Sequence, residues 1–168
     1  MIKAIVTVGF VGLLKPAPGT WGSFAALPLG IWLLFSFGFL PFLVAIGLAY
    51  AVGLACVARY AKPDDDPSEV VIDELVGQWI ALLPLGILWE GARFPNPLEW
   101  GLIGLAFVAF RLFDIRKPWL VGRADRLHGA TGIMLDDVIA GFFAACFVFV
   151  VYAGFIAALI ASNPWGSP

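Results

Sequence analysis

Acidic residues recur at the ends of apolar stretches in this chain. Asp73 and Glu74 precede one such stretch, Asp136 and Asp137 precede another, and Asp114 follows a third. Like charges brought close together repel, and a divalent cation relieves that repulsion. Mg²⁺ takes oxygen ligands, typically carboxylates together with waters and a substrate phosphate. The pattern therefore predicts a Mg²⁺ site for phosphoryl chemistry with these five carboxylates as candidate ligands, among which Glu74, Asp114 and Asp137 are favoured.

A block rich in proline and glycine precedes the first long apolar stretch. It runs KPAPGTWGS over residues 15–23 and contains two hydroxyl residues, Thr20 and Ser23. Thr20 is predicted to cap the following helix, whose first backbone N–H groups could bind a phosphate. The alternative is a helix start with no ligand at all.

Basic residues accompany the acid near residue 114. Arg111 and Asp114 are three residues apart, so they share one face of a helix. A local ion pair that ends the helix before Pro118 is the plain alternative. Ionisable groups in membrane helices are costly, however, and mark functional sites. Arg111 and Lys117 are therefore predicted to bind phosphate oxygens.

The single histidine, His128, is predicted to lie beside a glycine-rich loop that leads into Asp136 and Asp137 at the mouth of the following helix. A lone histidine is often an ordinary polar residue, but its place beside paired acids makes it a candidate catalytic group. The chain has too few histidines and cysteines for a zinc site. Cys56 and Cys146 lie inside apolar stretches and lack metal or redox spacing, so they are predicted to be inert.

Composition places these groups beside lipid. Of 168 residues, 61% are hydrophobic and only 13% are charged, whereas a soluble domain has about 45–50% and about 25%. We therefore expect a membrane-embedded protein. The net charge of −2 and the absence of a basic run predict no nucleic-acid partner.

The apolar segments predict an all-α fold. They cover residues 24–40, 42–58, 75–89, 100–113 and 138–161, with a tight turn expected at Pro41. The third and fourth are short for a membrane span, so they either tilt little or pair as a buried hairpin. Residues 1–14 are predicted to form an interfacial or partly inserted helix. The prediction is a small helical integral membrane bundle of four to five apolar helices, with 1–168 as a single domain.

If successive segments cross the membrane in alternating directions, the polar blocks all lie on one side of it. All carboxylates except Glu90 and Glu99 fall on that side, and so do all lysines and arginines except Arg93. Cytoplasmic loops carry the excess of lysine and arginine. That side is therefore predicted to be cytoplasmic, with the C-terminus outside.

Four blocks together resemble the phosphatidylglycerophosphatase A family. They are PAPGTWGS at 16–23, VIDELVGQW at 71–79, FRLFDIRKPW at 110–119 and HGATGIMLDD at 128–137. They occur in the family order with comparable spacing, and their combination is specific. One position departs from the pattern: Ala130 stands where glycine is expected.

The resemblance implies a Mg²⁺-dependent enzyme of the bacterial inner membrane. It would hydrolyse phosphatidylglycerophosphate to phosphatidylglycerol and phosphate at the cytoplasmic face. In this scheme Asp137 acts at the metal, His128 protonates the leaving glycerol oxygen, Lys117 offsets charge on the phosphoryl oxygens, and Thr20 and Ser23 donate hydrogen bonds to them. A covalent aspartyl-phosphate remains an alternative to direct attack by water, and the oligomeric state is left open.

Rival functions fit the sequence less well. A small ion or solute transporter also carries ionisable groups in membrane helices, but its site is expected near the bilayer midplane. Here the acids lie at the ends of apolar segments. A membrane assembly subunit would not need glycine turns beside paired acids. The DGxxAR…GxxxDxxxD pattern of CDP-alcohol phosphotransferases is missing, as are the motifs of cysteine, aspartyl and histidine phosphatases.

Overall fold

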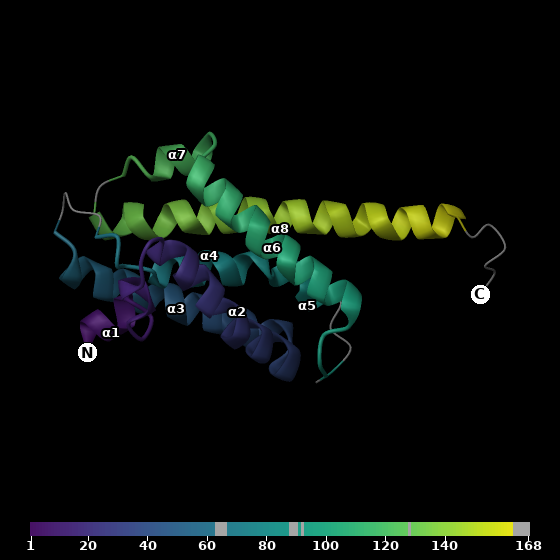
Figure 1. Cartoon of the computed structure of the whole chain (residues 1–168), viewed down its shortest axis with the longest axis horizontal. Coiled ribbons are helices and arrows are strands. Elements are labelled where there is room, and N and C mark those ends of the chain that lie inside the picture. The colour runs from purple at the N-terminus through teal and green to yellow at the C-terminus, as the bar shows by residue number, and fades with distance from the viewer. Residues whose placement is uncertain (63–66, 88–90, 92, 128, 163–168) are drawn as a thin grey trace.

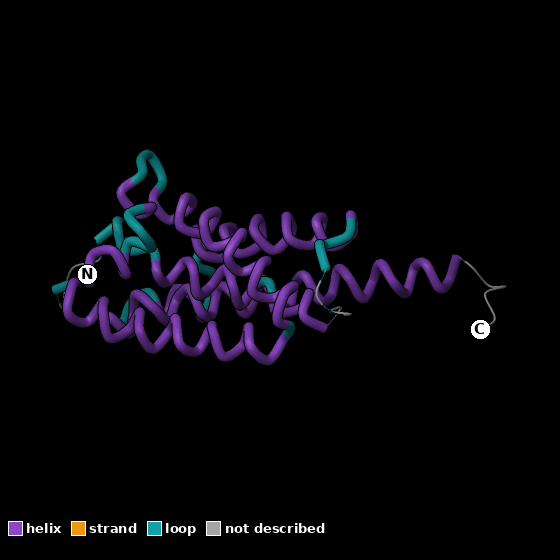
Figure 2. Tube along the Cα trace, turned by 90° about the horizontal axis from the view of Figure 1, so that it is seen from below, coloured by secondary structure: helices purple, strands orange, loops and turns teal. Residues whose placement is uncertain are grey.

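The computed structural model describes residues 1–62, 67–87, 91, 93–127 and 129–162, which form helices joined by turns and loops. No strand occurs in those residues, as Figures 1 and 2 show. The all-α prediction is confirmed. The elements are α1 (Ile2–Val6), the 3₁₀ turn η1 (Val11–Leu13), α2 (Pro18–Phe37), α3 (Phe39–Tyr60), α4 (Ile72–Ala81), α5 (Leu83–Ile87), α6 (Pro97–Arg116), α7 (Leu120–Ala124) and α8 (Gly129–Ser162).

Among the described residues, three helices are long and apolar enough to cross a membrane, namely α2, α3 and α8. Helix α6 equals α2 in length, but it contains four charged residues: Glu99, Arg111, Asp114 and Arg116. Helix α8 has 34 residues and is therefore about 51 Å long. Because the hydrocarbon core is only ~30 Å thick, α8 can cross it and still keep its first turns outside.

The third apolar segment is not one continuous helix. Its described residues are divided into α4 and α5, each of which is shorter than the about 20 residues of a helical span. Pro84 lies in the first turn of α5, where it supplies no N–H and its ring crowds the preceding turn. Helix α4 is packed against α2, α3, α6 and α8, and eight of its ten residues are buried. It is the central helix of the bundle.

The turn between α2 and α3 lies at Gly38 and not at Pro41. Gly38 has a φ of 87°, a value that favours glycine. Pro41 lies in the first turn of α3, where a missing N–H costs no helical hydrogen bond. The prediction of a turn at Pro41 was therefore wrong by three residues.

The N-terminal segment is two short elements and not one helix. Helix α1 ends at Val6, and the chain turns through Val8, Gly9 and Phe10, which all have positive φ. Val6 is fully buried, and its carbonyl oxygen accepts a hydrogen bond from the N–H of Val71. This contact fixes the approach to α4.

Close backbone contact between α4 and α8 sets the positions of the acids. A Cβ at Gly141 would clash with the carbonyl oxygen of Gly77, and a Cβ at Gly77 would meet the carbonyl oxygen of Asp137. Small residues allow membrane helices to approach in this way. The Nε1 of Trp79 also donates to the carbonyl oxygen of Ala26 at 2.9 Å, which ties α4 to α2.

Candidate active site

Eight of the ten predicted site residues line one pocket of about 230 Å³, and Ser23 is not among the lining residues. Its walls come from the start of α2, residues 67–70, the start of α4, the end of α6 and the first part of α8. Figure 1 shows α8 running along the molecule, so the pocket at its first part lies at the opposite end from its last turns. The lining includes Thr20, Asp73, Glu74, Arg111, Asp114, Lys117, Asp136 and Asp137.

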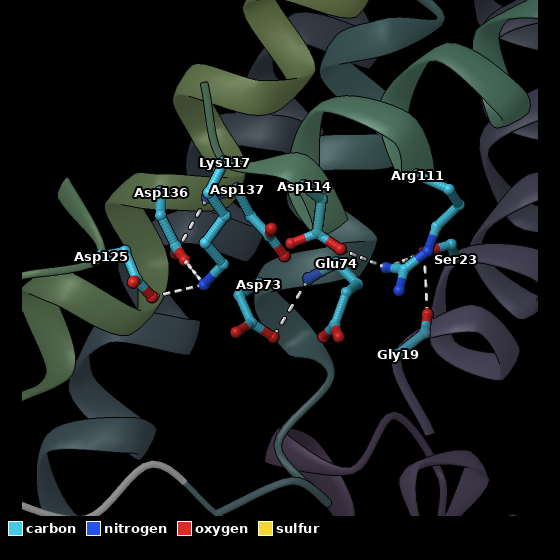
Figure 3. Close-up of polar contacts among 10 residues, drawn as sticks. All are labelled: Gly19, Ser23, Asp73, Glu74, Arg111, Asp114, Lys117, Asp125, Asp136 and Asp137. Carbon is cyan, nitrogen blue, oxygen red and sulfur yellow. Dashed lines mark hydrogen bonds and ion pairs between the residues drawn. The ribbon is translucent and has the colours of Figure 1, made fainter. Parts of the chain in front are cut away.

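Three carboxylates form the centre of the pocket. Asp73, Glu74 and Asp137 each place an oxygen within 4.8 Å of the others. Asp137 is only 3% exposed and Asp73 only 8%. Asp114 lies within hydrogen-bonding distance of Asp137. Figure 3 shows these four carboxylates pointing toward a common space. The tightest set therefore contains Asp73 in addition to two of the three favoured ligands.

The electrostatics of the cluster call for a positive charge. Burial raises the pKa of Glu74 to about 8, and the nearby carboxylates of Asp137 and Asp114 add to the effect of burial. Burial also raises the pKa of Asp73 well above its usual value, and the charge on Glu74 raises it further. Among the described residues, the Oε2 of Glu74 is buried without a hydrogen-bond partner. An acceptor without a donor beside two further carboxylates fits an oxygen-binding cation such as Mg²⁺.

Arg111 connects this cluster to α2. Its Nη1 lies 2.7 Å from the Oδ2 of Asp114 and 3.3 Å from the Oγ of Ser23. Ser23 is fully buried, and its hydroxyl donates to the carbonyl oxygen of Gly19 at 2.8 Å. The Nε of Arg111 is buried without a partner in the described part of the chain. The arginine that carries this donor lines the pocket.

Thr20 lines the pocket but does not cap the helix. Helix α2 begins at Pro18, with Ala17 as its N-cap. Proline suits the first helical position because its missing N–H has no intrahelical partner there. The prediction that Thr20 caps the helix was therefore wrong.

Lys117 is held by two carboxylates. Its Nζ donates to the Oδ2 of Asp136 at 2.8 Å and also pairs with Asp125. Burial lowers the pKa of Lys117, but the two hydrogen-bonded carboxylates together outweigh burial and raise it. The lysine is therefore firmly charged. Sequence reasoning missed Asp125, because it lies in a loop eight residues away with no local pattern that links it to Lys117.

Gln78 is a second residue whose environment was not predicted. It lies one helical turn after Glu74 on α4 and is fully buried. Neither its amide oxygen nor its amide nitrogen has a hydrogen-bond partner among the described residues. Buried amides are almost always satisfied by protein or water.

The block that begins at His128 differs from the prediction. His128 lies outside the described residues, so its predicted catalytic role stays a prediction. The stretch that follows is not a loop: Gly129 to Gly132 form the first turn of α8. Asp136 and Asp137 consequently lie about two turns inside α8 and not at its mouth. The loop prediction failed because the helix begins earlier than the apolar pattern does.

Replacing Gly19 with alanine is expected to disturb the site without harming the helix. A Cβ at Gly19 would clash with the Oε1 of Glu74 and crowd Arg111. A displacement of about 1 Å in a catalytic group can lower the rate ~100-fold, whereas alanine is the better helix former. We expect kcat/KM to fall by roughly ten- to a hundredfold with no loss of thermal stability. Steady-state kinetics and a melting curve measure both quantities.

Gly104→Ala is the matched control, because a Cβ there meets nothing within 4 Å. It lies on α6, away from the pocket lining. Its activity should equal that of the unmodified chain. Equal activity of Gly19→Ala and Gly104→Ala would show that the close approach of Gly19 to Glu74 does not matter.

The fold and the pocket define a helical membrane protein with an acidic and basic site at one end of its helices. Residues 4–152 match the family model described as "Phosphatidylglycerophosphatase A". The chain is 39% identical to the phosphatidylglycerophosphatase A of Haemophilus influenzae, over 88% of this chain and 86% of the relative. It is 34% identical to that of Escherichia coli, over 88% and 81%.

The chain belongs to the phosphatidylglycerophosphatase A family and is a phosphatase. A further relative, from Bacteroides thetaiotaomicron, bears the name "Putative phosphatidylinositol-3-phosphatase" and is 32% identical over 92% of this chain and 95% of that protein. No solved structure matches the chain.

Proposed function

We propose that the chain is a Mg²⁺-dependent phosphatase that hydrolyses phosphatidylglycerophosphate to phosphatidylglycerol and phosphate. The observation that carries the proposal is the pocket in which Asp73, Glu74 and Asp137 lie within 4.8 Å of one another and Arg111 and Lys117 lie close by. Carboxylates for a cation and fixed positive charges for phosphate oxygens are what phosphoryl transfer requires. Two relatives named phosphatidylglycerophosphatase A support the choice of substrate.

Asp73, Glu74 and Asp137 are the residues that would hold Mg²⁺, with Asp114 beside them. A bound Mg²⁺ would polarise the phosphoryl group and favour ionisation of an attacking water. Arg111 is oriented by Asp114 and Ser23, so its free Nε can bind a phosphoryl oxygen. Because the Arg111 side chain is already positioned before the substrate binds, it needs little reorganisation as negative charge develops on the phosphoryl oxygens.

Lys117 supplies a second positive charge at the pocket, and Asp136 acts mainly by orienting this lysine. Thr20 and the backbone at the start of α2 complete the phosphate side of the pocket. His128 is assigned the proton transfer to the leaving glycerol oxygen. Attack by water is the simpler route, with a covalent aspartyl-phosphate as the alternative.

Release of phosphate from a panel of lipids tests the proposal. The purified full chain in detergent is given phosphatidylglycerophosphate, phosphatidylinositol 3-phosphate or phosphatidic acid with Mg²⁺. We expect the highest kcat/KM with phosphatidylglycerophosphate. A preference for phosphatidylinositol 3-phosphate would show that this lipid is the substrate, in line with the name of the Bacteroides relative. A folded protein that releases phosphate from none of them contradicts the enzyme assignment of this pocket, and ion flux in proteoliposomes would then favour the transporter.

We further propose that the pocket faces the cytoplasm at the bacterial inner membrane. The pocket end carries most of the basic residues, including Lys15, Arg59, Lys62 and Arg116, whereas Arg93 precedes α6 at the other end. Cytoplasmic loops have this excess of lysine and arginine. The end of α8 would then lie outside.

Cysteine labelling tests this orientation. In a background without Cys56 and Cys146, Ser162→Cys is expected to react with a membrane-impermeant maleimide on intact spheroplasts. Arg126→Cys is expected to react only after lysis. Both positions are exposed. The reverse pattern would place the pocket on the outer side of the membrane.

A further inference from the structure

A second and larger cavity runs along the side of the molecule between α2 and α6. Its volume is about 890 Å³, and the residues that line it are apolar or aromatic except for Ser36 and Arg93. Phe35 and Ile103 are 3% exposed and lie deep in it. Trp32 and Trp100 are about half exposed and border it. We call this cavity, as lined by α2 and α6, the lateral groove.

The lateral groove and the carboxylate-lined pocket described above, from here on called the phosphate pocket, follow one another along α2. Residues four apart form a ridge that winds slowly around the helix axis, and Gly19, Ser23, Leu27, Ile31 and Phe35 follow that ridge. Gly19 lines the phosphate pocket and Ser23 is bonded to Arg111. Leu27, Ile31 and Phe35 line the groove. This ridge of α2 therefore changes from polar to apolar along its length.

Helix α6 shows the same change in the same direction. Arg111 lines the phosphate pocket, and Ile103 and Trp100 line the groove further along that helix. Between them, the ring of Phe107 meets that of Phe24 on α2 edge to face, with 6.3 Å between centroids. Both helices thus carry the polar pocket at one end and the apolar groove directly beyond it.

We propose that the lateral groove binds one acyl chain of the phospholipid whose phosphate occupies the carboxylate pocket. The inference rests on the proposed function and deepens it, because it makes the acyl chain part of what the enzyme recognises. A ligand with a charged head and an apolar tail matches the order of polarity along both helices. From Phe24 to Phe35 the groove covers twelve residues of α2, a rise of about 17 Å. That length is close to one leaflet of the ~30 Å hydrocarbon core.

Filling the groove tests the inference. Ile31→Trp adds bulk inside the groove, while Leu29→Trp adds the same side chain to an exposed position of α2 outside it. Each variant is assayed with dioleoyl and dihexanoyl phosphatidylglycerophosphate, which share one headgroup. The readout is the ratio of the two kcat/KM values. We expect Ile31→Trp to lower the ratio of long-chain to short-chain activity about tenfold, and Leu29→Trp to leave it within twofold of the unmodified chain.

Photo-crosslinking of the unmodified protein provides a second measurement that does not depend on how well the variants fold. The probe is phosphatidylglycerophosphate with a diazirine in one acyl chain. We expect cross-linked peptides from residues 24–36 and 100–107. Cross-links confined to α3 and α8, or cross-links of groove residues to a second copy of the chain, would overturn the inference.

The outcomes separate this inference from the proposed function. An unmodified chain that hydrolyses neither lipid contradicts the proposed function itself. A chain that hydrolyses both, with a folded Ile31→Trp variant whose ratio is unchanged, overturns only the acyl-chain groove. A proportional loss on both substrates also overturns it, because it would show that the substitution acts on the headgroup pocket. A selective loss on the long-chain lipid supports it.

Discussion

Asp137→Asn is expected to abolish most phosphate release while making the metal-free protein more stable. Asp137 is one of the three carboxylates whose oxygens lie within 4.8 Å of one another, and it is 3% exposed. Removing its charge removes a ligand and one source of repulsion at once. We expect kcat/KM to fall by roughly a thousandfold, the size seen when one transition-state contact is lost. The melting temperature without metal should rise, and the further rise on adding Mg²⁺ should shrink.

This pair of opposite effects distinguishes a functional carboxylate from a structural one. If Asp137 merely held the fold through Asp114, the variant would melt earlier, with or without metal. Asp125→Asn is the control, because it removes an exposed carboxylate that contacts Lys117 while Asp136 still holds that lysine. Its activity is expected to stay within tenfold of the unmodified chain. A fully active Asp137→Asn variant would exclude this residue from the site.

The gathering of the acids could be predicted because it depends only on segment order. When two consecutive apolar segments each run the length of the bundle, the chain returns to the end at which the first of them began. The paired acids before residues 75 and 138 and the acid after residue 113 must then meet. The structure brings Glu74, Asp114 and Asp137 together around one pocket. This result needed no knowledge of side-chain packing.

Helix boundaries were harder to predict from the sequence, because several of them have residues that are compatible with more than one boundary. Pro41 and Gly38 both break helices, yet proline fits the first turn of α3 and only Gly38 adopts the left-handed backbone. The glycines in residues 129–132 favour a loop, but these residues form the first turn of α8. The helix is continuous from Gly129 to Ser162. The third segment reads as one apolar stretch, although Pro84 divides it.

Individual side-chain contacts between distant elements could not be predicted from the sequence. The close approach of Gly19 to Glu74 joins α2 to α4, and nothing at either position signals the other. The pairing of Lys117 with Asp125 depends on the path of the chain through α7. The lateral groove likewise arises from the way in which α2 and α6 meet near the phosphate pocket. Such features follow from tertiary packing and not from residue spacing.

Removal of Mg²⁺ is expected to stop the reaction and to destabilise the protein most at alkaline pH. EDTA should reduce phosphate release to background, and added Mg²⁺ should restore it. Without metal, Glu74 has its pKa raised from 4.5 to about 8, chiefly by burial and then by the neighbouring carboxylates. A carboxyl group whose folded pKa is raised stabilises the fold below its unfolded pKa and loses that contribution as pH rises toward the folded value. The metal-free protein should therefore melt earlier as pH rises from about 5 to 8.

Mg²⁺ should reverse this trend, because it binds the ionised carboxylates and competes with protons for them. At a hundredfold excess over its dissociation constant, a ligand of the folded state stabilises by about 2.7 kcal/mol. In a chain of this length that corresponds to roughly 5–10 °C. The shift in melting temperature caused by Mg²⁺ should thus be small at pH 5.5 and reach this size near pH 8. A shift that is independent of pH, or one that Asp137→Asn retains in full, would place the ion away from Asp73, Glu74 and Asp137.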